Sequence, residues 1–118
     1  MLFDFDKFKG IAERIYPDGG YSLEDALEVF RYYFERYEKF TGKPHPPIKA
    51  KQIVNIAYDM PYLELQDRGT SSYVPIDPEQ YPDIIDQYFK TPFRNCDYNI
   101  NHFFSGRIRE LRYYELIM

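Results

Sequence analysis

Apolar residues recur at helical spacing along most of this chain, and the breaks in that spacing divide it into segments. The longest unbroken repeat lies between Ser22 and Gly42, where apolar residues follow the i, i+3, i+4, i+7 rule and charged residues fill the opposite face. Ser22 is of the type that caps a first turn, and Gly42 is of the type that ends a helix. The pattern predicts one long amphipathic helix whose apolar residues, Phe30 and Phe34 among them, face a core.

Further helices are predicted wherever the same spacing returns, with prolines and glycines marking their ends. They cover about residues 4–16, 47–60 and 77–91. The last of these can begin at Asp77, followed by proline at the first helical position, or only at Pro82. Together with the long helix and a C-terminal one, they predict an all-α fold of four to five helices, the first of them short.

The C-terminal helix is predicted from about residue 97 almost to the end of the chain, either unbroken or divided by a tight turn at Ser105-Gly106. On an unbroken helix the apolar residues fall on one side and the polar residues on the other. The inward side then carries Ile100, Phe103, Phe104, Ile108 and Leu111, and the solvated side carries Asn101, Ser105, Arg109 and Arg112.

Residues 61–76 allow two interpretations. Leu63 and Leu65 alternate with polar residues, as do Val74 and Ile76, and residues 67–72 could turn between them to make a small β-hairpin over about 62–76. Alternatively, the segment is an ordered connector that lies over the helices. We take residues 61–76 as the connector, with the hairpin as the alternative.

The two halves of the chain repeat a similar pattern. Residues 22–58 align without a gap on residues 77–113, so that Tyr33-Phe34 meets Tyr88-Phe89. This predicts a single helical domain, residues 1–118, containing an internal duplication: two related helical hairpins, 22–60 and 77–117, packed about a pseudo-twofold axis. The alternative is a coincidence between two amphipathic patterns of the same period.

Charge is distributed unevenly around a net value of −4. Basic residues concentrate in 41–57 and 90–118, whereas residues 58–89 are strongly acidic. Arginine and lysine neutralise phosphate, and asparagine and arginine hydrogen-bond base edges. A DNA- or RNA-binding protein of helix-turn-helix or winged-helix type is therefore the second function hypothesis. Its contact residues, which would equally suit an acidic partner, are Lys43, Lys49, Lys51, Asn101, Arg107, Arg109 and Arg112.

Tyrosine supports the first function hypothesis. The chain has 13 Tyr and no Trp, and several tyrosines lie outside the apolar pattern that defines the core. Exposed tyrosine is enriched at protein interfaces. We therefore expect a small non-enzymatic binding or adaptor protein that contacts a protein partner or a second copy of itself. The expected interface residues are Tyr32, Tyr62, Tyr73, Tyr98 and Tyr114.

Catalytic and metal-binding patterns are weak. Cys96, Asp97 and His102 bring nucleophile, acid and base types close together in sequence, but a histidine beside two phenylalanines is typical of a core edge. Cys96, His102 and His45 lack any standard zinc spacing, and no glycine-rich phosphate loop occurs. No catalytic residue, metal site or cofactor is predicted, and the chain is not expected to be an enzyme.

The single cysteine indicates a reducing compartment, since no intramolecular disulfide can form. No stretch approaches the length of an apolar membrane span, and the acidic N-terminus lacks the order of a signal peptide. The expected location is cytoplasmic, without membrane contact.

Overall fold

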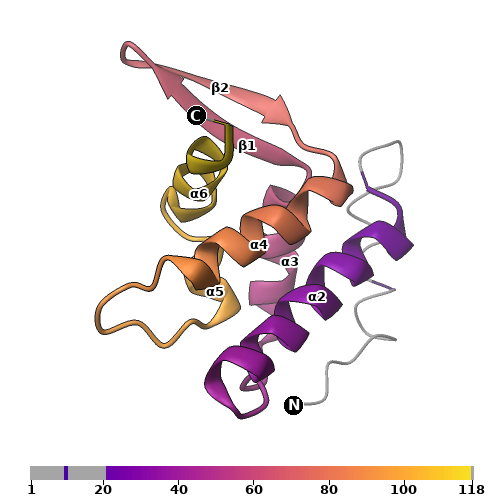
Figure 1. The fold of residues 1–118 in the computed structure, drawn as a ribbon. Helices are drawn as coiled ribbons and strands as arrows, with labels where there is room; N and C mark the ends of the chain where they lie inside the picture. Colours follow the sequence, from indigo (N-terminus) through magenta and orange to yellow (C-terminus); the bar gives the residue numbers. More distant parts are fainter. Residues whose placement is uncertain (1–9, 11–20, 118) are drawn as a thin grey trace.

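The computed structural model of the protein describes residue 10 and residues 21–117, and it combines helices with a small antiparallel sheet (Figure 1). The prediction of an all-α fold is therefore wrong. The predicted helix over residues 4–16 lies, apart from Gly10, outside the described residues. The elements in chain order are α2 (Leu23–Thr41), α3 (Ala50–Asp59), β1 (Tyr62–Asp67), β2 (Thr70–Pro75), the 3-10 turn η1 (Pro78–Gln80), α4 (Tyr81–Lys90), α5 (Ile100–Phe103) and α6 (Ile108–Ile117).

Helix α2 begins and ends where the sequence predicts. The side chain of Ser22 accepts a hydrogen bond from the backbone N–H of Asp25 at 3.1 Å. At the other end Gly42 has φ 80°, and its N–H donates to the carbonyl of Glu38. A left-handed residue after the last turn favours glycine because glycine has no Cβ to clash.

Residues 62–75 form a β-hairpin, so the connector interpretation is wrong. Arg68 and Gly69 both have positive φ, 52° and 83°, which is the two-residue turn that best suits the twist of paired strands. Leu63 pairs with Val74 on the face turned to the core, and Glu64 pairs with Tyr73 on the other face. The turn is shorter than the six residues 67–72 considered from sequence, and the two strands are correspondingly longer.

The core is a layer of aromatic rings between α2, α4 and α5. The ring of Tyr33 lies within 5.3–6.1 Å of the rings of Phe89, Phe103 and Tyr88. Buried tyrosine needs a partner for its hydroxyl, and here the partners are backbone carbonyls. The acceptors of Tyr21, Tyr33 and Tyr81 are the carbonyls of Ile76, Tyr98 and Met60, at 2.5–2.7 Å.

His45 joins the loop after α2 to α5. Its Nε2 accepts a hydrogen bond of 2.9 Å from the N–H of Ile100, and its Nδ1 lies 2.7 Å from the carbonyl of Pro46. These two contacts require the neutral tautomer that carries its proton on Nδ1. Burial lowers the pKa of His45, which favours the same neutral form.

Helix α6 buries two residues that the sequence predicts to be solvated and exposes one that it predicts to be buried, while Ile108 packs against the core as predicted. Arg109 and Arg112 are 5% and 8% exposed, whereas Leu111 is 51% exposed. The C-terminal helix is divided at Ser105-Gly106, where Gly106 has φ 54°, so the periodicity that begins at Ile100 does not continue into α6. The predictions of a solvated Arg109 and Arg112 and of an inward Leu111 are wrong.

The arginines of α6 are buried because they satisfy backbone carbonyls at the ends of other helices. Arg109 Nη1 donates to the carbonyl of Asp59, the last residue of α3, at 2.8 Å. Arg112 Nη2 donates to the carbonyl of Thr91, the residue that follows α4, at 3.2 Å. The last carbonyls of a helix have no intrahelical partner, and they lie at the negative end of its dipole. A cationic donor at that point is favourable because it gives the carbonyl a partner and places a positive charge at the negative end of the dipole.

The predicted duplication stays a prediction. Its first unit contains α2 and α3, and its second contains α4, α5 and α6, with the hairpin between them.

Candidate functional site: an acidic groove between α2 and α4

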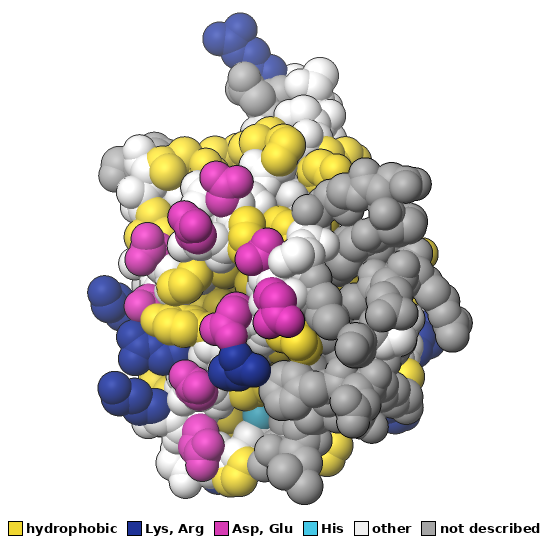
Figure 2. All heavy atoms as spheres, turned by 90° about the vertical axis from the view of Figure 1, so that its right-hand side faces the viewer, with side chains coloured by type: hydrophobic (Ala, Val, Ile, Leu, Met, Phe, Trp, Pro, Cys, Tyr) yellow, Lys and Arg dark blue, Asp and Glu magenta, His cyan; other side chains and the backbone are white. Residues whose placement is uncertain are grey.

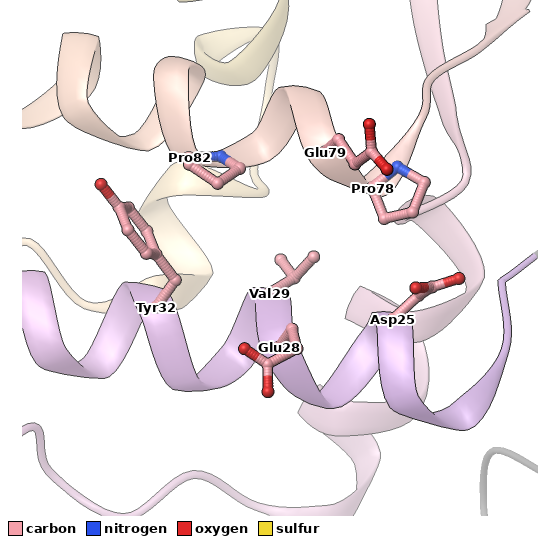
Figure 3. A pocket seen from close by; sticks show the side chains of 7 residues that line it. All are labelled: Asp25, Glu28, Val29, Tyr32, Pro78, Glu79 and Pro82. Atoms are coloured by element: carbon pink, nitrogen blue, oxygen red, sulfur yellow. The ribbon is translucent and has the colours of Figure 1, made fainter.

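A groove of about 220 Å³ lies between the first half of α2 and the segment where η1 leads into α4 (Figure 3). From α2 it is lined by residues that recur at i, i+3, i+4 and i+7 and so share one face of the helix. From the other side it is lined by residues of η1 and the first turn of α4. The seven lining residues are Asp25, Glu28, Val29, Tyr32, Pro78, Glu79 and Pro82.

The middle of the groove is apolar. Val29 points from α2 toward the opposite wall, where Pro82 and Pro78 lie, and Tyr32 stands at one end (Figure 3). Proline has no backbone N–H. The two prolines can therefore form an open wall without leaving a donor unpaired, and they also begin η1 and α4 with the backbone angles that a first turn requires.

Three carboxylates line the groove beside this apolar middle, and Glu28 lies on the side of α2 turned away from the two prolines (Figure 3). Asp25 and Glu28 come from α2 and Glu79 from η1, with Asp25 and Glu79 at the end away from Tyr32 (Figure 3). Glu28 forms an exposed ion pair with Arg31. The face of the molecule turned to the viewer in Figure 2 carries acidic side chains with hydrophobic ones between them. The groove therefore combines an apolar floor with a negative rim.

A hydrogen-bonded cluster holds Tyr32 in place at its end of the groove. Its hydroxyl donates to Asp86 Oδ1 at 2.7 Å, and Arg36 Nε donates to the same oxygen at 2.7 Å. Burial alone would raise the pKa of Asp86, but the hydrogen bonds from Arg36 and Tyr32 outweigh it and lower that pKa. The guanidinium of Arg36 also lies 5.6 Å from the centre of the Tyr32 ring.

Only one of the five tyrosines expected at an interface, Tyr32, lines this groove. Tyr62 and Tyr73 are exposed on the hairpin, and Tyr114 is half-buried with its ring against Tyr113. Tyr98 is buried in the core, where its hydroxyl bonds to the backbone of Phe93, so its expected exposure is wrong.

The residues expected to contact nucleic acid do not form one surface. The lysines Lys43, Lys49 and Lys51 are exposed near the loop after α2, at the lower end of Figure 1, while α6 lies beside the hairpin at the upper end. Arg109 and Arg112 are bonded to backbone carbonyls, and Arg107 Nη2 donates to the carbonyl of Glu64 at 3.1 Å. Asn101 is half-buried, and its side-chain N–H donates to Asn99.

Most residues of the groove were not selected from sequence. The sequence identifies Pro78 and Pro82 only as residues at the start of a helix, a role that is compatible with lining a groove, and it does not single out Asp25 or Glu79. A usable signal was available: two acidic helix starts, at 24–25 and 77–79, that pack against each other once α2 and α4 are neighbours.

The structure brings Cys96 and His102 together but leaves Asp97 apart from them. Cys96 Sγ lies 3.4 Å from His102 Nδ1, which also contacts the Tyr88 hydroxyl at 2.7 Å, whereas Asp97 accepts a hydrogen bond from Asn99 N–H. Among residues 21–117, no three His, Cys, Asp or Glu side chains come together as a metal site would require.

The chain matches no protein-family model, no curated protein and no solved structure. None of the helices described here combines the length and the apolar character needed to cross a membrane. A functional proposal therefore depends on the geometry and charge of the groove itself.

Proposed function

We propose that this protein is a non-enzymatic binding protein that holds a basic segment of a partner protein in the groove between α2 and α4. The observation that carries the proposal is the placement of three carboxylates, Asp25, Glu28 and Glu79, beside an apolar floor that includes Val29 and Pro82.

Lysine and arginine side chains fit this arrangement because they have an apolar stem and a charged head. The stem can lie along the proline rings, above the nearly buried Val29, while the head pairs with the rim carboxylates. Each exposed ion pair contributes only about 0.2–1 kcal/mol. Affinity then depends on several such pairs together with the apolar contact, and it falls as salt is added.

The same carboxylates would repel a phosphate backbone. The net charge of −4 and the inward direction of Arg109 and Arg112 also disfavour a nucleic-acid partner. A basic peptide segment is complementary both to the groove and to the chain as a whole.

Binding can be tested with a fluorescently labelled peptide in which lysine and arginine alternate with leucine and valine, using the glutamate version of that peptide as the negative probe. The variant Glu28→Gln/Glu79→Gln removes two rim charges. We expect it to weaken binding about tenfold, which corresponds to two ion pairs of ordinary strength.

The matched control is Glu35→Gln/Glu38→Gln, which removes the same charge from exposed positions of α2 outside the groove. It should bind the peptide almost as the unmodified protein does. Equal weakening by both variants would show that overall charge attracts the peptide, and no binding at low salt would refute the proposed function.

A further inference from the structure

A second cleft, of about 200 Å³, opens between the hairpin, the end of α3 and the start of α6. We call it the tyrosine cleft, because three exposed tyrosines line it, Tyr58 from α3, Tyr62 from β1 and Tyr73 from β2, together with Asp59 and Glu64. The groove between α2 and α4 shares none of these residues.

The three tyrosines differ from those of the core. Tyr58, Tyr62 and Tyr73 are 63%, 46% and 72% exposed. Within residues 21–117 their rings contact no other aromatic ring and their hydroxyls find no hydrogen-bond partner, whereas Tyr33 and Tyr81 have both kinds of contact. Neither the rings nor the hydroxyls of these three side chains are engaged in such contacts, so they are free to contact a ligand.

The hairpin register places a carboxylate between two of the rings. Glu64 pairs directly with Tyr73, and Tyr62 projects from the same face of β1 two residues away. The backbone N–H of Glu64 donates to Glu110 of α6 at 3.2 Å, and its carbonyl accepts from Arg107, just before α6, at 3.1 Å, so neither group joins the ladder. Cross-strand side chains come closest at such non-hydrogen-bonded pairs.

Arg109, the one cation among the described residues that line the cleft, is already engaged. Arg109 Nη1 donates to the carbonyl of Asp59 and to the Tyr81 hydroxyl, and its guanidinium lies 5.1 Å from the centre of the Phe104 ring. Its Nε lies 3.8 Å from a carboxylate oxygen of Glu110, which offsets its charge.

The remaining carboxylates leave the cleft negative. Neither Asp59 nor Glu64 has a side-chain hydrogen bond to any other described residue. Since Arg109 is neutralised by Glu110, these two carboxylates are an excess of negative charge among aromatic rings. Such an environment favours a cation.

We propose that the tyrosine cleft binds the trimethylated ammonium group of a modified lysine on a partner protein. The π faces of aromatic rings attract cations, and aromatic surroundings suit quaternary ammonium groups in particular. Methylation removes the N–H donors that a plain lysine would offer to water or to a carboxylate. The rings then supply the cation–π contact, and Asp59 and Glu64 supply long-range attraction.

Titration calorimetry and NMR with short peptides test this proposal. The three probes are a peptide with trimethyllysine, the same peptide with lysine, and the same peptide with the neutral isostere in which carbon replaces the ammonium nitrogen. The trimethyllysine peptide should bind most tightly. Tyr73→Leu and Tyr58→Leu should each weaken it about two- to fivefold, the effect of one cation–π contact at an exposed site, and Tyr73→Phe should restore it.

Tyr114→Leu, outside the cleft, is the control for loss of a tyrosine, and Glu28→Gln/Glu79→Gln should leave this binding unchanged even if the groove proposal fails. Equal binding of the neutral isostere would show apolar contact without recognition of charge. Tighter binding of plain lysine would show carboxylate pairing instead. Either result, or no binding of the trimethyllysine peptide, would overturn the proposal.

Discussion

Helices α2 and α6 are both amphipathic, yet α2 buries its apolar side and α6 buries much of its charged side. In α2 the buried residues include Phe30 and Tyr33, and the ring of Tyr33 lies 5.5 Å from that of Phe103 in α5. In α6 the buried residues are Arg109, Glu110 and Arg112, which bond to neighbouring backbone. The difference depends on what the buried side chains meet. Tyr33 of α2 meets rings from α4 and α5, whereas the buried charged residues of α6 meet the ends of α3 and α4 and the edge of β1.

The ends of helices and the edges of sheets carry backbone groups without a regular hydrogen-bond partner, and burying such groups unpaired costs free energy. In α6, Arg109 donates to the carbonyl of Asp59 at the end of α3, and Arg112 donates to the carbonyl of Thr91 just after α4. At β1, the N–H of Glu64 donates to Glu110 of α6, and the carbonyl of Glu64 accepts from Arg107, just before α6. An amphipathic pattern shows that a helix has two faces. It does not show which face is buried when the neighbour offers unpaired backbone.

The largest effect is expected in the aromatic layer. Phe30 is fully buried, so Phe30→Ala removes a ring from a close-packed core and should lower the free energy of unfolding by about 3–5 kcal/mol. Urea unfolding followed by circular dichroism measures this change. A loss below about 1 kcal/mol would show that α2 does not anchor the core.

A somewhat smaller effect is expected inside α6. Arg109→Met keeps much of the side-chain volume but leaves the Asp59 carbonyl and the Tyr81 hydroxyl without their donor, and Glu110 without its counter-charge. We expect a loss of about 2–4 kcal/mol. Leu111→Glu, on the exposed side of the same helix, should change stability by less than about 0.5 kcal/mol.

The same urea measurement on both variants decides which face of α6 is buried. A reversed order, with Leu111→Glu the more damaging, would restore the face predicted from apolar spacing and contradict the capping role of Arg109.

The pH dependence of stability tests the burial of neutral His45, which joins the loop after α2 to α5. The pKa of His45 is lowered by burial, so the folded state binds its proton less readily than the unfolded chain does. Its contribution to stability is therefore fully present above the ordinary value of 6.5 and is lost as pH falls below it. Thermal unfolding between pH 8 and pH 5 should show this loss, and His45→Gln should remove that part of it.

The contrast between α2 and α6 also explains which parts of the fold and of the groove the sequence predicts. Helix α2 was predicted with its caps because Ser22, Gly42 and the apolar stripe are local signals. The hairpin was undecided because its turn, Arg68-Gly69, is a weak two-residue signal. Of the groove, only Tyr32 was singled out, since a groove is created by the packing of two segments about fifty residues apart. The buried arginines could not be placed, because their acceptors belong to other elements.

For Gly106→Ala the sign of the stability change, rather than its size, is decisive. In an unbroken helix, Gly106→Ala would stabilise the protein by about 1 kcal/mol, because alanine is the better helix former. In the structure Gly106 has φ 54° in the turn between α5 and α6, with open space around it, so alanine meets no clash but must adopt a left-handed backbone. We expect a loss of about 1 kcal/mol in the free energy of unfolding, measured by urea unfolding.

The matched substitution Ser105→Ala, one residue earlier, tests whether any change at this turn is harmful, since the Ser105 hydroxyl donates to the carbonyl of His102. Stabilisation by Gly106→Ala would mean that α5 and α6 form one helix. The phase of α6, and with it the burial of Arg109 and Arg112, would then have to be reassigned.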